Sequence, residues 1–208
     1  MNIAFIFMAS GFGKRFGANK LYAPLKGKPL YCHGLKCLME AAERLEKEGH
    51  RIRFLVVSQY RKILEDGERL GLESVYNSGS SEGITASLRL GTEAAGEDTD
   101  ICLFFVADQP YMKSATVAEF VRGFINSGFG MGCVCCKGKP GNPAAFSRKY
   151  REELMKLHGD KGGSVLMKAY PQDVWLLEVS REELRDIDVQ EDLDRGQELP
   201  GKEAEGNR

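Results

Sequence analysis

The feature that most constrains the fold is an apolar run near the N-terminus that leads directly into a glycine-rich, basic loop. The run is Ile3-Ala4-Phe5-Ile6-Phe7, and an uninterrupted apolar segment of this kind is typical of a parallel strand buried on both faces. Glycines in a loop let backbone N–H groups approach an anion closely, and nearby cations favour a polyphosphate. The loop carries Gly11, Gly13, Lys14, Arg15, Gly17 and Lys20.

Two common phosphate-binding motifs do not fit this loop. The dinucleotide fingerprint G-x-G-x-x-G has Phe16 where its third glycine should stand. Moreover, Pro24 and Pro29 are expected to keep the chain irregular until about Leu30, so no helix opens at once. The P-loop needs Ser or Thr after its Gly-Lys pair, whereas Arg15 follows here. We therefore expect phosphate binding of another design, the alternative being a solvated surface turn.

Length and charge exclude several classes of protein. The chain has 208 residues, which suits one α/β domain with a proper core. Its 29 Lys+Arg and 30 Asp+Glu give a net charge of −1, which indicates neither nucleic acid nor a membrane surface as a partner. No apolar run reaches the roughly 18 residues of a membrane span, and the N-terminus lacks a cationic, cleavable signal pattern. We expect a cytoplasmic protein.

The cysteines do not have the spacing of a metal site. The group Cys133-x-Cys135-Cys136 lacks a C-x-x-C pair and has no histidine near it. In a strand, Cys133 and Cys135 would face one way and Cys136 the other. Buried, reduced thiols are therefore the favoured interpretation of the six cysteines.

Strands and helices are predicted to alternate along the chain. Further strands are expected at 52–57, 74–76, 101–106, 131–135, 144–146 and 174–179, with a Gly/Pro loop at 138–143. Helical periodicity is found at 35–45, 61–70, 85–94 and 117–125, and two more helices follow residue 146. This alternation predicts an α/β three-layer sandwich around a mostly parallel, twisted sheet. We expect a single domain over 1–193 and a disordered, charged tail over 194–208.

Carboxylates are placed to meet the glycine loop. Asp108 follows the predicted strand that ends at Val106, and ligands bind at the carboxyl ends of parallel strands. Such an aspartate suits a divalent-metal ligand beside a triphosphate, although a turn or helix cap is an equal alternative. Asp186 and Asp188 would point to one side of a strand, but this run is by itself more typical of an acidic surface turn.

These residues, taken with later segments, carry a specific resemblance. The opening resembles the signature L-A-A-G-x-S-x-R-M-G-x-x-K-L of small nucleotidyltransferases with a GT-A-like, Rossmann-related fold. Within that group the chain resembles the molybdenum cofactor cytidylyltransferases over residues 3–193, because further segments match in order. They are 83–91 (containing Ser-Leu-Arg), 107–110 (Ala-Asp-Gln-Pro), 141–143 with 159–163 (Gly-Asn-Pro and Gly-Asp-Lys-Gly-Gly), and 186–188.

The resemblance implies an activity and a set of site residues. CMP from CTP would be joined to the terminal phosphate of molybdopterin, with Mg²⁺ as cofactor and pyrophosphate released. The implied nucleotide-binding residues are Ala9, Ser10, Gly11, Gly13, Lys14, Arg15, Lys20, Asn77 and Ser87. Arg15, Lys20 and Asp108 would be catalytic, with Lys20 reaching the α-phosphate. Asp108 and Asp188 would hold the metal, with Asp186 as a less favoured ligand. The pterin substrate would meet Asn142, Asp160 and Lys161.

Other substrates and another class of function remain open at this stage. Asn142 stands where relatives commonly have His, which affects the pterin contacts more than the nucleotide site. The same chemistry could use GTP, or CTP with another phosphate acceptor, since base choice depends on a few hydrogen bonds. A carrier that delivers finished cofactor to a molybdenum hydroxylase would not need the metal-binding carboxylates. A recipient hydroxylase is an implied partner, but no segment identifies its docking surface.

Overall fold

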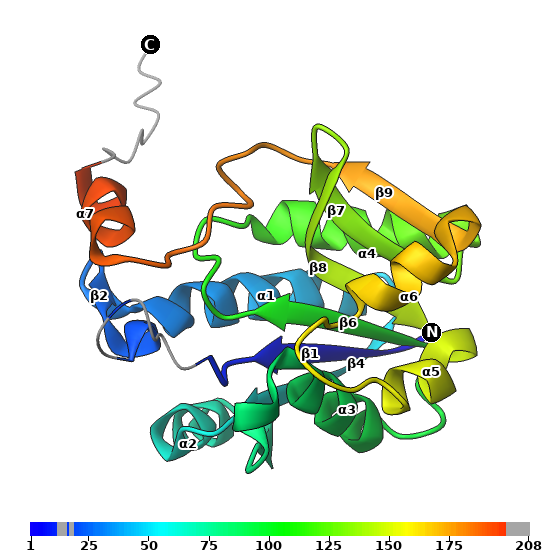
Figure 1. Cartoon of the computed structure of the whole chain (residues 1–208), viewed down its shortest axis with the longest axis horizontal. Coiled ribbons are helices and arrows are strands. Elements are labelled where there is room, and N and C mark those ends of the chain that lie inside the picture. The colour runs from blue at the N-terminus through cyan, green and yellow to red at the C-terminus, as the bar shows by residue number, and fades with distance from the viewer. Residues whose placement is uncertain (12–15, 17–18, 199–208) are drawn as a thin grey trace.

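The computed structural model describes residues 1–11, 16 and 19–198, and its centre is a seven-stranded sheet (Figure 1). Its strands are β1 (Asn2–Met8), β4 (Arg51–Ser58), β5 (Glu73–Tyr76), β6 (Ile101–Val106), β7 (Met131–Cys136), β8 (Lys139–Ser147) and β9 (Val174–Glu178). They lie in the order β5-β4-β1-β6-β8-β7-β9. Strand β8 runs antiparallel to both of its neighbours, and every other neighbouring pair is parallel. The predicted mostly parallel sheet is confirmed.

Helices cover both faces of this sheet, which confirms the three-layer sandwich. Alternate residues of β1 face opposite layers: Phe5 and Phe7 join one buried apolar cluster, while Ile6 and Met8 join another. The first cluster is completed by α1 (Leu30–Glu46), α2 (Arg61–Arg69) and α4 (Ser114–Ser127), and the second by α3 (Ile84–Ala95), α5 (Arg151–Met155) and α6 (Ser164–Ala169). Among the described residues, no helix is both long and apolar enough to cross a bilayer.

Short elements connect the glycine loop to α1. They are a 3₁₀ turn, η2 (Lys20–Tyr22), and a small hairpin of β2 (Pro24–Leu25) and β3 (Lys28–Pro29). The side chains of Leu25, Leu30, Ile187 and Leu193 form a separate buried cluster. This cluster holds the C-terminal helix α7 (Gln190–Glu198) against the hairpin, and Figure 1 shows α7 beside β2.

The prediction of a loop at 138–143 was wrong, because β8 begins at Lys139. Prolines at 140 and 143 suggested a loop, since proline cannot donate a ladder hydrogen bond. However, Lys137 and Gly138 both have positive φ, at 52° and 71°, which is the geometry of a tight two-residue hairpin turn. The turn returns β8 directly onto β7, and the pairing register shifts between Cys133 and Cys135. That irregularity accommodates residues 141–143.

The predicted start of the tail at 194 was also too early. Helix α7 crosses that position and continues to Glu198. Two hydrogen bonds and one buried side chain hold its first turn. The Asp192 carboxylate accepts from the N–H groups of Asp188 and Val189 at 3.1 and 3.2 Å, and Leu193 is buried. Positions 199–208 of the predicted tail lie outside the described residues.

The cysteines are free thiols, as the sequence predicted. Four are buried and two, Cys32 and Cys136, are half-buried. Burial raises the pKa of Cys37 and of Cys102 to about 12, so both stay protonated at neutral pH. Within the described part of the chain, no group of three or more His, Cys, Asp or Glu side chains could hold a metal ion.

The carboxylate of Asp173, far from the carboxyl ends of the parallel strands, is expected to make the stability of the protein depend on pH. Its carboxylate accepts from Lys149 Nζ (2.7 Å), Gly130 N (2.8 Å) and the Tyr150 hydroxyl (2.7 Å). These hydrogen bonds lower its pKa from 3.8 to about 2. A depressed pKa means that the stabilisation is complete above about pH 4 and is lost as the pH falls through about 2.

Asp173→Asn is therefore expected to lower the free energy of unfolding by about 1 kcal/mol at pH 7, since solvent screens part of the ion pair. The difference from wild type should shrink between pH 4 and pH 2. Urea unfolding of both proteins across this range measures it, with exposed Glu152→Gln as control. A difference that is the same at every pH would contradict the assignment.

Candidate functional site

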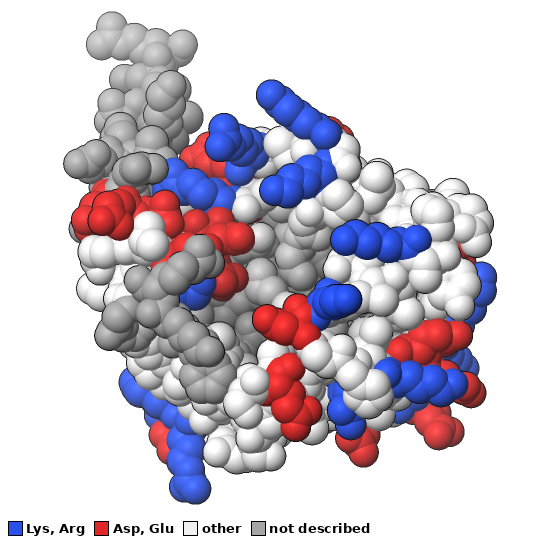
Figure 2. All heavy atoms as spheres, viewed as in Figure 1, with Lys and Arg blue, Asp and Glu red and all other residues white. Residues whose placement is uncertain are grey.

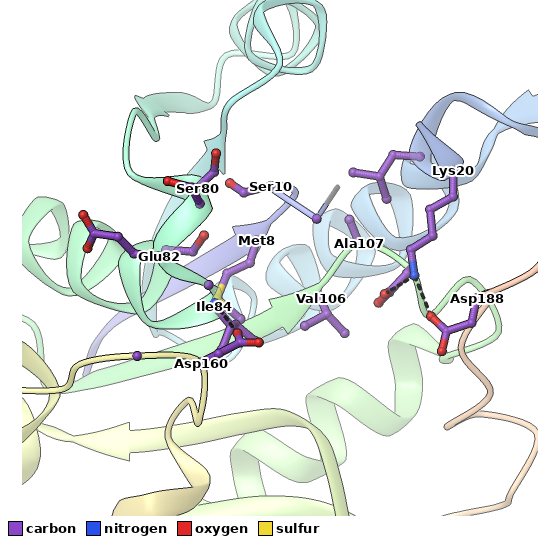
Figure 3. A pocket seen from close by; sticks show the side chains of 17 residues that line it. Met8, Ser10, Lys20, Ser80, Glu82, Ile84, Val106, Ala107, Asp160 and Asp188 are labelled. Carbon is purple, nitrogen blue, oxygen red and sulfur yellow. Dashed lines mark hydrogen bonds and ion pairs between the residues drawn. The ribbon is translucent and has the colours of Figure 1, made fainter. Parts of the chain in front are cut away.

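The candidate site is a cavity of about 900 Å³ at the carboxyl ends of β1 and β6. Figure 2 shows this face with acidic and basic side chains gathered around a hollow. In Figure 3, Lys20 and Asp188 lie at one end of the cavity and Ser80, Glu82 and Asp160 at the other. Seven residues predicted from the sequence line it: Ser10, Gly11, Lys20, Ser87, Asp108, Asp160 and Asp188.

The ammonium group of Lys20 joins two carboxylates from distant parts of the chain. Its Nζ lies 2.8 Å from Asp108 Oδ2 and 2.9 Å from Asp188 Oδ1. Burial alone would lower the pKa of Lys20, but the two carboxylates outweigh it and the pKa is raised above its usual value. Lys20 is thus a buried, fully charged cation on the cavity wall. Asn19 fixes the turn that carries it, because its side-chain oxygen accepts from Leu21 N.

The segment that carries Asp188 is held beside the loop after β6. Ile187 N donates to the carbonyl of Asp108 at 3.0 Å, and Gln109 Nε2 donates to Asp186 Oδ1 at 2.7 Å. Asp186 thus faces Gln109, and burial is the main cause that raises its pKa. Asp108 Oδ1 is buried and has no hydrogen-bond partner among the described residues. A carboxylate oxygen of this kind, next to a second carboxylate, suits a divalent cation.

Asn77 lies behind the cavity wall instead of lining it. Its side chain is completely buried, and its Nδ2 donates to Ser10 Oγ (3.1 Å) and to Ser87 Oγ (3.0 Å). The two serines line the cavity and come from the glycine loop and from α3. Asn77 therefore orients both hydroxyl groups, and its expected contact with the ligand would be made through them.

The turn that contains Asp160 packs onto the start of α3. Asp160 Oδ1 accepts from Ile84 N at 3.0 Å, and the Thr85 hydroxyl donates to the carbonyl of Gly159. Gly83 has φ 91°, and a β-carbon there would lie 2.3 Å from Asp160 Oδ1. Only glycine fits, because both the left-handed backbone and the close approach exclude a side chain. This contact closes one end of the cavity.

The remaining residues that were predicted for the site either do not line the cavity or lie outside the described residues. The backbone pairing of β6 with β8 ends at Phe104 and Ala144. Beyond it, Asn142 Oδ1 accepts from Val106 N at 3.1 Å, so a side chain takes the place of a backbone carbonyl as the partner of β6. Neither Asn142 nor Lys161 is among the residues that line the cavity. Ala9 is buried, and its carbonyl accepts from Ser58 Oγ. The predicted residues Gly13, Lys14 and Arg15 lie outside the described residues.

The sequence did not single out two groups of residues near the cavity. One is the turn η3 (Ser80–Glu82), which lines the cavity together with Ile84. The other is the segment Ser58-Gln59-Tyr60, whose side chains contact the start of the glycine loop. Only their position in the sequence could have indicated them, since both segments lie at or after the ends of strands that end at the same edge of the sheet as β1.

Comparison with known proteins places this chain in a family. Residues 5–174 match the family described as MobA-like NTP transferase domain. The chain belongs to this family of nucleotidyltransferases. The match covers most of the chain, including the glycine loop, Asp108 and Asp160. A comparison with curated protein sequences gave no match.

Three solved structures illustrate the similarity in fold. Rv0371c from Mycobacterium tuberculosis H37Rv, in complex with manganese, has a TM-score of 0.76 at 20% identity, covering 95% of this chain and 99% of that one. The 4-diphosphocytidyl-2C-methyl-D-erythritol synthase of Anaerococcus prevotii has a TM-score of 0.72 at 16% identity, and the likeness covers 94% of each chain. Molybdopterin-guanine dinucleotide biosynthesis protein A of Archaeoglobus fulgidus has a TM-score of 0.68 at 17% identity, covering 95% of this chain and 97% of that one. These likenesses show the nucleotidyltransferase fold.

Proposed function

We propose that the protein transfers CMP from CTP to the terminal phosphate of molybdopterin and releases pyrophosphate. The observation that carries the proposal is the convergence of Lys20, Asp108 and Asp188 on one wall of the cavity, beside the start of the glycine loop. A buried cation and two carboxylates can together neutralise a triphosphate and its metal ion. The choice of CTP and molybdopterin comes from the sequence resemblance, through the segments that contain Ser87, Asn142 and Asp160.

The reaction needs positioning more than proton transfer. An oxygen of the molybdopterin phosphate attacks the α-phosphorus of CTP, the bond from that phosphorus to the bridging oxygen breaks, and pyrophosphate leaves. A phosphate monoester is largely ionised near neutral pH, so no strong general base is required. Lys20 would stabilise charge on the α-phosphate, and Arg15 is proposed to act on the same phosphates. Alignment and neutralisation supply the rate enhancement.

The carboxylates fit a magnesium ion. Asp108 and Asp188 offer hard oxygen ligands, and Asp108 Oδ1 is buried without a partner among the described residues. One or two carboxylates that share the ion with substrate phosphates are the usual protein contribution to such a site. Magnesium there would neutralise charge on the phosphates. Manganese in the structure of Rv0371c, a protein of the same fold, supports a divalent cation as cofactor.

The two ends of the cavity suggest how the substrates are divided. The backbone of Ser10 and Gly11 would meet the triphosphate next to Lys20, and the Ser87 hydroxyl, oriented by Asn77, would contact the ribose or base. We propose that Asp160 and Lys161, on the turn that closes the far end, contact the pterin. The Asn142 side chain would contribute indirectly, since its oxygen is engaged by Val106 N.

A second candidate is the same transfer from GTP. It is favoured by the likeness to a protein named for molybdopterin-guanine dinucleotide biosynthesis. CTP with a different phosphate acceptor is supported in the same way by the named diphosphocytidyl synthase. A cofactor carrier without catalysis is disfavoured, because it would have no use for a lysine and two aspartates that converge on one cavity wall.

The proposal is tested by incubating the protein with Mg²⁺, molybdenum-loaded molybdopterin and CTP, GTP or ATP at equal concentrations. We expect a cytosine dinucleotide product from CTP, identified by its mass, and little product from GTP or ATP. A guanine dinucleotide product would support the second candidate, transfer from GTP, instead. No product from any nucleotide, with folded protein that binds Mg-CTP, would contradict molybdopterin as the acceptor.

A further inference from the structure

Three consecutive carbonyl groups at the start of the glycine loop each accept a hydrogen bond from a side chain at the end of β4, in the segment Ser58–Tyr60. Three consecutive residues donate to three consecutive residues in the same order along the chain. Ser58 Oγ donates to Ala9 O (2.7 Å), Gln59 Nε2 to Ser10 O (2.7 Å), and the Tyr60 hydroxyl to Gly11 O (2.9 Å). Because three side chains direct these carbonyls, the backbone at the entrance of the loop has one orientation.

This orientation leaves N–H groups for a ligand. Among the described residues, the amide N–H groups of Ser10 and Gly11 donate to no acceptor, whereas Ala9 N donates to Val57 O within the sheet. Ser10 and Gly11 both line the cavity. Successive backbone N–H groups that face a cavity bind the oxygen atoms of a phosphate. The side chains behind the loop therefore determine where a phosphate can be bound.

Gln59 has a second contact, with the turn η3. Its Oε1 accepts from Ser80 Oγ at 3.0 Å, and Ser80 begins this turn, which lines the cavity beside Ser10 (Figure 3). One side-chain amide thus joins the backbone of Ser10 to the side chain of Ser80. Both groups of the amide are used, so a rotation about its last bond would break both contacts at once.

Tyr60 connects the two ends of the same loop. Its hydroxyl donates to the carbonyl of Gly11 at the start, and its ring packs edge-on against Tyr22, two residues after Lys20, with the centroids 5.8 Å apart. One tyrosine thus contacts residues on both sides of positions 12–18. Of the three side chains Ser58, Gln59 and Tyr60, it is Gln59 that contacts η3, so the connection between the start of the loop and this turn depends on Gln59.

We propose that Gln59 is a positioning residue whose side-chain amide sets the spacing between the glycine loop and the turn Ser80–Glu82, and thereby the affinity of the cavity for a nucleoside triphosphate. The inference rests on the proposed function in taking a nucleoside triphosphate as the ligand. Gln59 acts through Ser10 and Ser80, which line the cavity, and is not a catalytic residue.

The test is a calorimetric titration of Mg-CTP into wild type and Gln59→Met, which keeps the length of the side chain but has neither donor nor acceptor. We expect the Kd to rise about ten-fold, since two partners lose a hydrogen bond. The KM for CTP should rise in parallel with little change in kcat, because the lost interaction serves ground state and transition state equally. Gln172→Met is the matched control and should bind like wild type, because Gln172 is an exposed glutamine in the turn before β9, the strand at the opposite side of the sheet from β4 and β5.

A double-mutant cycle with Ser80→Ala separates the connection from a general loss of stability. Ser80→Ala alone should raise the Kd about three-fold, and in the Gln59→Met background it should have no further effect. An unchanged Kd in Gln59→Met, or equal effects of Ser80→Ala in both backgrounds, would overturn the inference. If Gln59→Met does not fold, wild-type affinity in Ser80→Ala would overturn it. A wild type that binds no CTP would contradict the proposed function instead, and titration with GTP would then test the same connection.

Discussion

Asp108→Asn is expected to lower turnover by about 10³-fold while the protein stays folded. Asparagine keeps the shape of the side chain and an oxygen that can accept from Lys20 Nζ, so the hydrogen bond at 2.8 Å can persist. It removes the negative charge that would hold a metal ion beside the triphosphate. The loss should therefore appear in kcat and not in the temperature of unfolding. Steady-state pyrophosphate release and thermal unfolding, measured on the same preparation, separate the two effects.

The control for Asp108→Asn is Asp98→Asn, the same chemical change at an exposed aspartate. Asp98 precedes the amino end of β6, whereas the cavity lies at the carboxyl end of this strand. This variant should turn over like wild type. Near wild-type turnover by folded Asp108→Asn would refute the role given to this carboxylate.

Lys20→Met should have two effects of opposite sign. Turnover should fall by about 10³-fold, because the cation that stabilises the α-phosphate is lost. Binding of Mn²⁺ in the absence of nucleotide should become about ten-fold tighter. In the structure the ammonium contacts both proposed metal ligands, at 2.8 and 2.9 Å, so a metal ion binds only to molecules in which those contacts have opened. The apparent Kd is raised by the small fraction of such molecules.

Direct titration of Mn²⁺, followed by the electron paramagnetic resonance of the free ion, measures the second effect without any turnover. Lys36→Met removes an exposed lysine that forms an ion pair with Glu40 and should leave both quantities unchanged. Weaker Mn²⁺ binding in Lys20→Met would mean that the lysine supports the metal site instead of competing for it. Lys20→Gln is the second variant if loss of the ammonium group between the two carboxylates prevents folding of the first.

The fold could be predicted because its signals are local. Apolar runs such as Ile3–Phe7 and helical periodicity indicate strands and helices without knowledge of their neighbours. The prediction was wrong at 138–143, where prolines favoured a loop but the two positive φ angles at Lys137 and Gly138 close a hairpin. It was also wrong at 194, because the packing of Leu193 against Leu25 and Leu30 cannot be read from a charged segment.

The candidate site could be predicted only in part. Because ligands bind at the carboxyl ends of parallel strands, Ser10, Lys20 and Asp108 were predicted to lie at one edge of the sheet, and in the structure all three line one cavity. The pairing of Lys20 with two carboxylates could not be predicted, since it joins residues 20, 108 and 188 in space. Gln59 has no sequence signal, because a glutamine after a strand is ordinary until Ser10 and Ser80 are seen on either side of it.

The most direct test of the account is pyrophosphate release by the wild-type protein with CTP and Mg²⁺, measured with and without molybdenum-loaded molybdopterin. We expect release that requires the pterin, equals the dinucleotide formed mole for mole, and falls by about 10³-fold in Asp108→Asn. Release that is independent of the pterin, or that continues near the wild-type rate in folded Asp108→Asn, would contradict the claim that this cavity transfers a nucleotidyl group to a phosphate acceptor.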